Sequence, residues 1–146
     1  MKMMTRNTDY AVRAICHMAR KGGGVISVTA LFGELKIPRP FLRKILQTLG
    51  RKGLVRSSRG LGGGFELAVS PDKIFVADII EAFQGPFSIN ECIFKRKACP
   101  NTKECPLKKR MDRISERVES ELRSITIGSL IKYVATHAEE KDNKYR

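Results

Sequence analysis

Three cysteines, Cys92, Cys99 and Cys105, have the clearest chemical potential in this chain because they fall within fourteen residues. Their segment shows neither helical nor strand periodicity, and proline directly follows two of them. Proline fixes the backbone and removes an N–H donor, so such a loop is stiff and holds its thiols in a set arrangement. Thiolate is the ligand that soft metals and iron–sulfur clusters favour. The spacing therefore predicts a loop that binds a soft metal or an iron–sulfur cluster.

Composition favours a compartment in which these thiols stay reduced. The 146 residues suit one domain, or one small domain with a helical arm. No apolar run is long enough to span a membrane, and residues 1–4 lead into polar sequence rather than a signal core. We therefore expect a cytoplasmic protein without membrane contact, whose clustered cysteines are ligands rather than disulfides.

The net charge of +13 is concentrated in the first half of the chain. Residues 1–70 hold 13 Lys and Arg against 3 Asp and Glu, whereas residues 71–146 hold 15 against 12. Contacts with phosphate and the release of counterions dominate affinity for nucleic acid. This asymmetry favours a nucleic-acid partner over a basic surface that is merely solvated.

The first half of the chain also predicts a helix-turn-helix. Helical apolar spacing extends over residues 10–19, preceded by the capping side chains of Asn7-Thr8-Asp9, and a glycine run at 22–24 ends that helix. A short second helix is expected over residues 27–35, with Ser27 as its cap. A proline tolerated in the first turn then opens a third helix over residues 38–49.

The third helix has the character of a DNA-recognition helix. Arg39, Arg43 and Lys44 lie off its apolar stripe, near its start. The residues expected to form the buried stripe are Phe41, Leu42, Ile45, Leu46 and Leu49. An ordinary three-helix core with solvated arginines is the alternative interpretation.

A predicted β-hairpin favours the DNA-binding interpretation. Residues 53–58 and 64–69 have strand character, and the connection at 59–63 joins Arg59 to four residues of which three are glycine. A helix-turn-helix followed by such a hairpin is a winged helix, whose tip arginine can approach phosphates or enter a narrow minor groove. Glycine-rich loops also bind nucleotides, but no Gly-Lys-Ser/Thr sequence follows, which argues against a P-loop.

The second half predicts a helix that joins two subunits. A short amphipathic helix is expected over residues 76–83, and a long, mostly charged helix from Leu107 to about Ile125 after the cysteines. Its apolar residues recur three or four apart: Leu107, Met111, Ile114, Val118, Leu122 and Ile125. Such a narrow stripe favours a dimer seam over one face of a monomeric core. A last short helix is expected over residues 127–135, and residues 139–146 form a charged tail expected to be disordered.

Several landmarks together resemble the Rrf2 family of bacterial transcription regulators over nearly the whole chain. They are Asp9-Tyr10-Ala11, Pro40-Phe41-Leu42, the stretch from Leu54 to Gly60, the stretch from Gly63 to Ala68, the stretch from Val76 to Ala82, and the cysteine loop. The resemblance implies a mainly α fold with a small β-hairpin wing. It places a winged helix-turn-helix domain at 1–85, a cysteine-rich loop at 86–106, and a dimerisation helix with a short C-terminal helix at 107–138.

The resemblance also implies a homodimer that binds a palindromic double-stranded DNA operator as a regulator, expected to be a repressor. The expected DNA contacts are Ser27, Arg39, Pro40, Arg43, Lys44, Arg59 and Gly60. Arg43 stands where family members that control cluster biogenesis tend to have a glutamate, so a different operator is expected. Neither an enzymatic activity nor a small-molecule substrate is expected.

A [2Fe-2S] or [4Fe-4S] cluster near the dimer interface is the cofactor that the resemblance implies, sensing nitric oxide, redox state or the supply of iron or clusters. Cys92, Cys99 and Cys105 match the family's cluster ligands. No histidine stands just after the third cysteine, where some members have one. Asp9 matches an aspartate that serves as fourth ligand, across the dimer, in the members that respond to nitric oxide; its alternative role is capping the first helix.

Other chemistries stay open for the cysteines. They could act directly as redox thiols in a cluster-free regulator of the same family. They could also hold a structural zinc ion, although such sites prefer four Cys or His ligands. An enzyme is the least favoured class, because the two histidines, His17 and His137, are not near a candidate nucleophile pair. Cys16, among apolar residues in the first helix, is interpreted as a buried packing residue.

Overall fold

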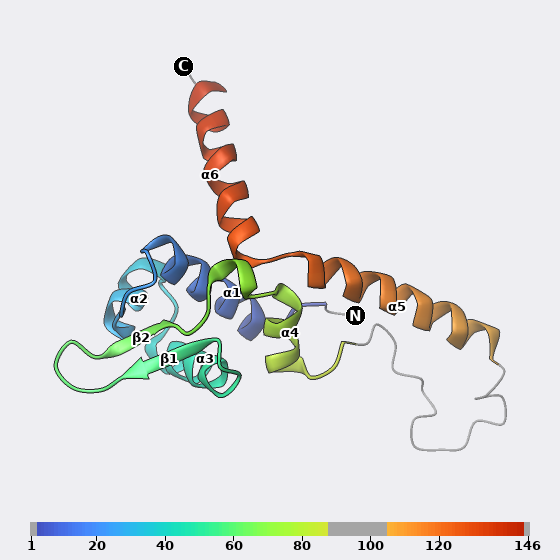
Figure 1. Cartoon of the computed structure of the whole chain (residues 1–146), viewed down its shortest axis with the longest axis horizontal. Coiled ribbons are helices and arrows are strands. Elements are labelled where there is room, and N and C mark those ends of the chain that lie inside the picture. Colours follow the sequence, from blue (N-terminus) through green and yellow to red (C-terminus); the bar gives the residue numbers. More distant parts are fainter. Residues whose placement is uncertain (1–2, 88–104, 145–146) are drawn as a thin grey trace.

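The computed structural model describes residues 3–87 and 105–144, with side chains as far as His137. It shows a helical head from which two long helices extend in different directions (Figure 1). The elements in chain order are α1 (Arg6–Arg20), α2 (Val28–Leu35), α3 (Arg39–Arg51), β1 (Val55–Ser58), β2 (Gly64–Leu67), the short 3₁₀ helix η1 (Pro71–Lys73), α4 (Val76–Gln84), α5 (Pro106–Ser124) and α6 (Ile127–Lys144). The predicted fold class, mainly α with a β-hairpin, is confirmed.

The core of the head lies between α1, α3 and α4, with α2 packed on its side. Its fully buried side chains include Ile15, Met18, Leu31, Leu42, Leu46, Leu49, Ile74 and Ile79. The apolar stripe predicted for α3 is confirmed except at Phe41, which is 50% exposed. Phe41 lies in the first turn at the edge of the stripe, so the core that covers Leu42 leaves it open to solvent.

The first turn of α1 differs from the sequence-based expectation. Thr5, rather than Asn7, Thr8 or Asp9, is the N-cap, and its side chain accepts a hydrogen bond from the Thr8 backbone N–H at 3.4 Å. Because the helix already begins at Arg6, Asp9 lies inside it and cannot cap it. The capping role considered for Asp9 is therefore wrong.

The hairpin forms an antiparallel ladder in which Ser57 pairs with Phe65. On the other side of β2, Ile26 and Phe65 exchange backbone hydrogen bonds of 2.8 and 2.9 Å, which fastens the hairpin to the segment before α2. A Cβ atom on Gly64 would collide with the backbone of Ile26, so this contact needs glycine. At the tip, Gly60 has φ 95°, a left-handed conformation that glycine adopts at little cost.

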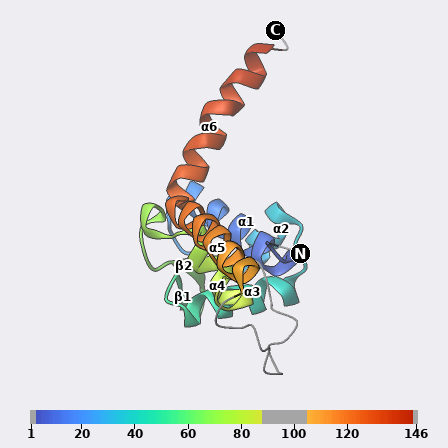
Figure 2. The ribbon, with the colours of Figure 1, turned by 90° about the vertical axis from the view of Figure 1, so that its right-hand side faces the viewer.

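The corner between α5 and α6 is joined to the head by backbone hydrogen bonds. The Val76 N–H donates to the Ile125 carbonyl and the Ile127 N–H donates to the Ile74 carbonyl, both at 2.9 Å. Ile127 is fully buried in the head's core. From this corner α5 extends past α4, while α6 packs its first turns on α1 and η1 and then projects away from the head (Figures 1 and 2).

The last helix is longer than expected. α6 runs from Ile127 to Lys144, so the predicted end of the helix at 135 is wrong, and the helix continues into the segment that was expected to be a disordered tail. No glycine or proline follows Gly128, and alanine, glutamate and lysine are strong helix formers. The helix can therefore continue without an apolar face.

None of the helices in the described part of the chain combines the length and the apolar character that a membrane span requires.

Candidate nucleic-acid interface and metal ligands

The exposed side of α3 gathers four of the predicted DNA contacts. Arg39, Pro40, Arg43 and Lys44 are all exposed, whereas Leu42 turns into the core from the same turns of the helix. The guanidinium carbon of Arg39 lies 5.2 Å from the centre of the Phe32 ring in α2, within cation–π range. This contact links the start of α3 to α2 and limits the positions that Arg39 can take.

Ser27 lies at the start of α2 and is exposed. Its hydroxyl accepts a hydrogen bond of 3.1 Å from the Ala30 backbone N–H, so the predicted capping role is confirmed. The helix N-terminus that Ser27 caps carries partial positive charge, which suits a nearby phosphate. Contact between Ser27 and DNA stays a prediction.

The hairpin presents its tip to solvent. Arg59 and Gly60 are exposed there, as expected, and Leu61 is fully exposed. Closer to the head, Arg56 Nε lies 2.8 Å from Glu66 Oε1 across the ladder. Arg56 is therefore paired within the hairpin. Arg59 is the basic residue at the hairpin tip.

Two exposed apolar side chains near these basic residues were missed by sequence reasoning. Phe41 was assigned to the core by its spacing, and Leu61 was passed over among glycines. Both can touch thymine methyl groups or sugars if the basic residues meet DNA. For Leu61 the sequence did carry a signal of exposure, because an apolar residue within a glycine-rich turn has few neighbours that could bury it.

The metal-ligand prediction is only partly covered by the structure. Cys92 and Cys99 lie outside the described residues. Cys105 is half-buried and forms the N-cap of α5. Asp9 lies in the first turn of α1 with its side chain 46% exposed, 3.0 Å from Arg13 Nε. Among the described residues no three His, Cys, Asp or Glu side chains are placed so that they could hold a metal ion, so the predicted ligand set is neither assembled nor excluded.

A hydrogen-bond network fixes the helical turn that carries Asp9. The hydroxyl of Thr8, a fully buried side chain, donates to Gln84 Oε1 at 2.8 Å, and the Thr5 backbone N–H donates to the same oxygen at 3.0 Å. Gln84 is the last residue of α4, three positions before the end of the described head. No sequence signal indicated this contact, because 76 residues separate its partners.

Cys16 packs against the core from α1, as predicted, but it is only partly buried. This burial raises the pKa of its thiol, an effect that Arg20 partly offsets. The neutral thiol is therefore favoured, which makes Cys16 a poor metal ligand or nucleophile.

The apolar stripe of α5 is not buried within this chain. In α5, all of which the structure describes, no side chain is buried; Leu107 is 68% and Ile114 is 48% exposed. Met111, Val118, Leu122 and Ile125 are partly buried. The helix therefore leaves apolar surface uncovered along its length, as a dimer seam requires.

A helix-turn-helix with a basic, exposed third helix and a glycine-tipped hairpin defines a winged-helix DNA-binding protein. Residues 4–133 match the family model of Rrf2, described as an iron-dependent transcriptional regulator. The chain belongs to the Rrf2 family of transcriptional regulators, as the resemblance predicted, and it is a regulator rather than an enzyme.

Individual relatives agree with this assignment. A putative HTH-type transcriptional regulator of Aquifex aeolicus is 31% identical over 88% of this chain and 90% of its own length. The HTH-type transcriptional regulator NsrR of Bacillus subtilis is 31% identical over 72% of this chain and 73% of its own. The structure of CymR, the global cysteine regulator of B. subtilis, matches with a TM-score of 0.76 and 29% identity over 91% of this chain and 98% of CymR.

Proposed function

We propose that this chain is a homodimeric repressor whose affinity for a palindromic operator depends on an iron–sulfur cluster. The observation that carries the proposal is the position of Cys105, the last of the three clustered cysteines. It is the N-cap of α5. The same helix bears the uncovered apolar stripe. A ligand held at Cys105 would therefore act directly on the helix that joins the subunits.

The DNA contacts follow from the head. In a symmetric dimer, α3 of each subunit enters the major groove, and half-sites lie roughly one helical turn (~34 Å) apart. Arg39, Arg43 and Lys44 project from the exposed side of α3, and Arg59 reaches the flanking groove from the hairpin. Arginine donates two hydrogen bonds to guanine, so Arg43 favours a guanine in each half-site.

Cys105 and Asp9 are the described members of the proposed ligand set, and both support a cluster. Cys105 is partly buried at the positive end of the α5 dipole, which would stabilise an anionic ligand. Cys92 and Cys99 supply two further thiolates, and Asp9 of the partner subunit is the proposed fourth ligand. When bound, such a cluster supplies iron that reacts with nitric oxide or oxidants. Asp9 must first leave Arg13, and its 46% exposed carboxylate can turn away without unfolding α1.

The test is anaerobic purification followed by visible absorption, iron and sulfide analysis, and operator binding before and after nitric oxide. The wild type should contain iron and sulfide, and cluster damage should change operator affinity. Cys99→Ser should abolish the cluster. Cys16→Ala is the matched control and should retain it, because Cys16 packs in the head. A cluster that survives Cys99→Ser would disprove the ligand set.

A cluster-free regulator that uses its cysteines as redox thiols is the second candidate. The likeness to CymR of Staphylococcus aureus, whose structure was solved in an oxidized form, favours it over the zinc alternative. In that case the anaerobic protein would contain no iron, and oxidation by peroxide would change operator affinity in a Cys-dependent way. A colourless protein with one zinc per chain would instead support a structural metal.

A further inference from the structure

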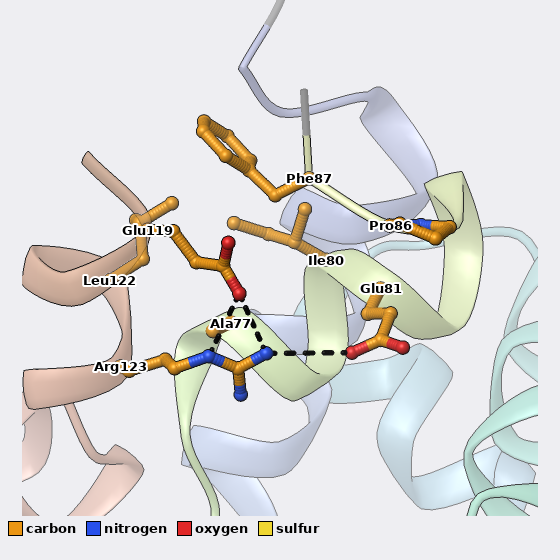
Figure 3. A pocket seen from close by; sticks show the side chains of 8 residues that line it. All are labelled: Ala77, Ile80, Glu81, Pro86, Phe87, Glu119, Leu122 and Arg123. Carbon is orange, nitrogen blue, oxygen red and sulfur yellow. Dashed lines mark hydrogen bonds and ion pairs between the residues drawn. The ribbon is translucent and has the colours of Figure 1, made fainter. Parts of the chain in front are cut away.

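Arg123, near the end of α5, contacts three carboxylates on two helices. Its Nε and Nη2 atoms lie 3.0 and 2.8 Å from Glu119 Oε1, one turn back along α5. Across the interface, Nη2 lies 3.9 Å from Glu81 in α4 (Figure 3). Nη1 lies 3.6 Å from Asp78, in the same helix. The hydrogen bond to Glu119 raises the pKa of the Arg123 guanidinium, which is already charged at physiological pH. Arg123 therefore links the direction of α5 to α4.

Apolar packing at this joint is loose. A cavity of about 110 Å³ lies between α4 and α5, lined by Ala77, Ile80, Phe87 and Leu122 together with charged side chains (Figure 3). No side chain of α5 is buried, whereas the corner that follows it is joined to the head by two backbone hydrogen bonds. The end of α5 is thus anchored by hydrogen bonds. Among the described residues, its contacts with α4 include the ion pairs of Arg123, which bear on the angle of the helix.

A small change in that angle has a large effect at the other end of α5. The helix has 19 residues. At 1.5 Å per residue its length is about 27 Å, so a turn of about 10° moves the far end by about 5 Å. One base pair adds only about 3.4 Å along DNA. In a dimer joined through α5, such a change would alter the separation of the two heads by more than one base pair.

We propose that Arg123 is a positioning residue that sets the angle between α5 and the head, and thereby the half-site spacing that the dimer accepts. This inference rests on the proposed dimerisation through α5 and on a palindromic operator. Exposed ion pairs of this kind contribute little to stability. Arg123 therefore acts on geometry and leaves the fold intact.

The experiment selects DNA from a library of duplexes with a random core of about 30 base pairs, roughly three helical turns. Selection is done in parallel with wild type, Arg123→Met, Arg123→Lys and Arg117→Met. Arg117 is the matched control, because it is an exposed arginine of the same helix and its replacement removes the same charge. Affinities are then measured for the selected half-site at spacings one base pair shorter and longer. Thermal unfolding and sedimentation verify that each variant is a folded dimer.

Wild type and Arg117→Met should select one spacing and prefer it by at least about tenfold. Arg123→Met should select the same half-site at several spacings, lose roughly two- to fivefold in affinity for the original one, and discriminate among them by less than threefold. Arg123→Lys should lie between, since it retains the charge without the two-atom contact to Glu119. A single, unchanged spacing in Arg123→Met would overturn the inference. If wild type selects no palindrome, the proposed function fails as well.

Discussion

The head and α5 differ in how far their apolar side chains are buried within this chain. In the head, Leu42, Leu46 and Leu49 are fully covered by other helices of the same chain. In α5 the apolar residues recur at comparable spacing, yet no side chain is buried. The same apolar spacing thus gives a buried stripe in α3 and an uncovered one in α5, because a stripe is buried only where other parts of the chain pack on it. The comparison indicates that the head buries its apolar residues within one chain, whereas the stripe of α5 stays available for the second chain of the proposed dimer.

The largest expected effect breaks the head. Leu46→Ala should lower the free energy of unfolding by about 2–5 kcal/mol, because the substitution leaves a cavity at a site with no exposed surface. Urea denaturation followed by circular dichroism measures the change. Leu61→Ala is the matched control: Leu61 is fully exposed, and its replacement should change stability by less than about 0.5 kcal/mol. Equal effects of the two substitutions would contradict the proposed core.

The next substitution breaks α5 and spares the head. Ile114→Lys should raise the dissociation constant of the dimer roughly a hundredfold, about 2.8 kcal/mol, because a two-fold seam receives two unpaired charges. Analytical ultracentrifugation measures it. Glu116→Gln, at an exposed position near Ile114, is the matched control. It makes the net charge more positive by the same amount and should leave the dimer intact. Unfolding of the head by Ile114→Lys would contradict the proposal that α5 is a separate dimerising element.

The smallest expected effect separates DNA reading from dimerisation. Arg43→Ala should weaken operator binding by about 1–3 kcal/mol and relax the preference at one base of each half-site. The dimer should be unchanged, because Arg43 projects from the exposed side of α3. Fluorescence anisotropy with matched and mismatched duplexes measures both affinity and preference. Uniform weakening on all sequences would reassign Arg43 to phosphate contact.

Local patterns in the sequence accounted for most of the head. The cap at Ser27 and the helix that begins after Pro38 were predicted because each depends on neighbouring residues only. Phe41 was misassigned because spacing alone does not say where the edge of a buried stripe lies. The alternative capping role of Asp9 was wrong for a similar reason, since a cap depends on the residue at which the helix starts, and here Thr5 is the cap.

Contacts between distant residues were beyond sequence reasoning. Nothing in the spacing of Thr8 indicates Gln84, and nothing in the seam of α5 distinguishes Arg123 from the other arginines of the helix. Each of these contacts exists because α4 packs against α1 on one side and against α5 on the other. α4 was predicted as an ordinary short amphipathic helix, yet it is the element through which the other two meet.

The sequence by itself determined the family, the winged-helix class, the basic recognition helix and the three clustered cysteines. These depend on residue type, short-range periodicity and turn chemistry, which any stretch of chain carries with it. Only the tertiary structure decided that Thr8 is locked to Gln84, that Arg123 joins α5 to α4, and that the apolar stripe of α5 stays open. Those outcomes depend on how complete helices pack, and side-chain contacts across such interfaces arise only once the fold has brought remote segments together.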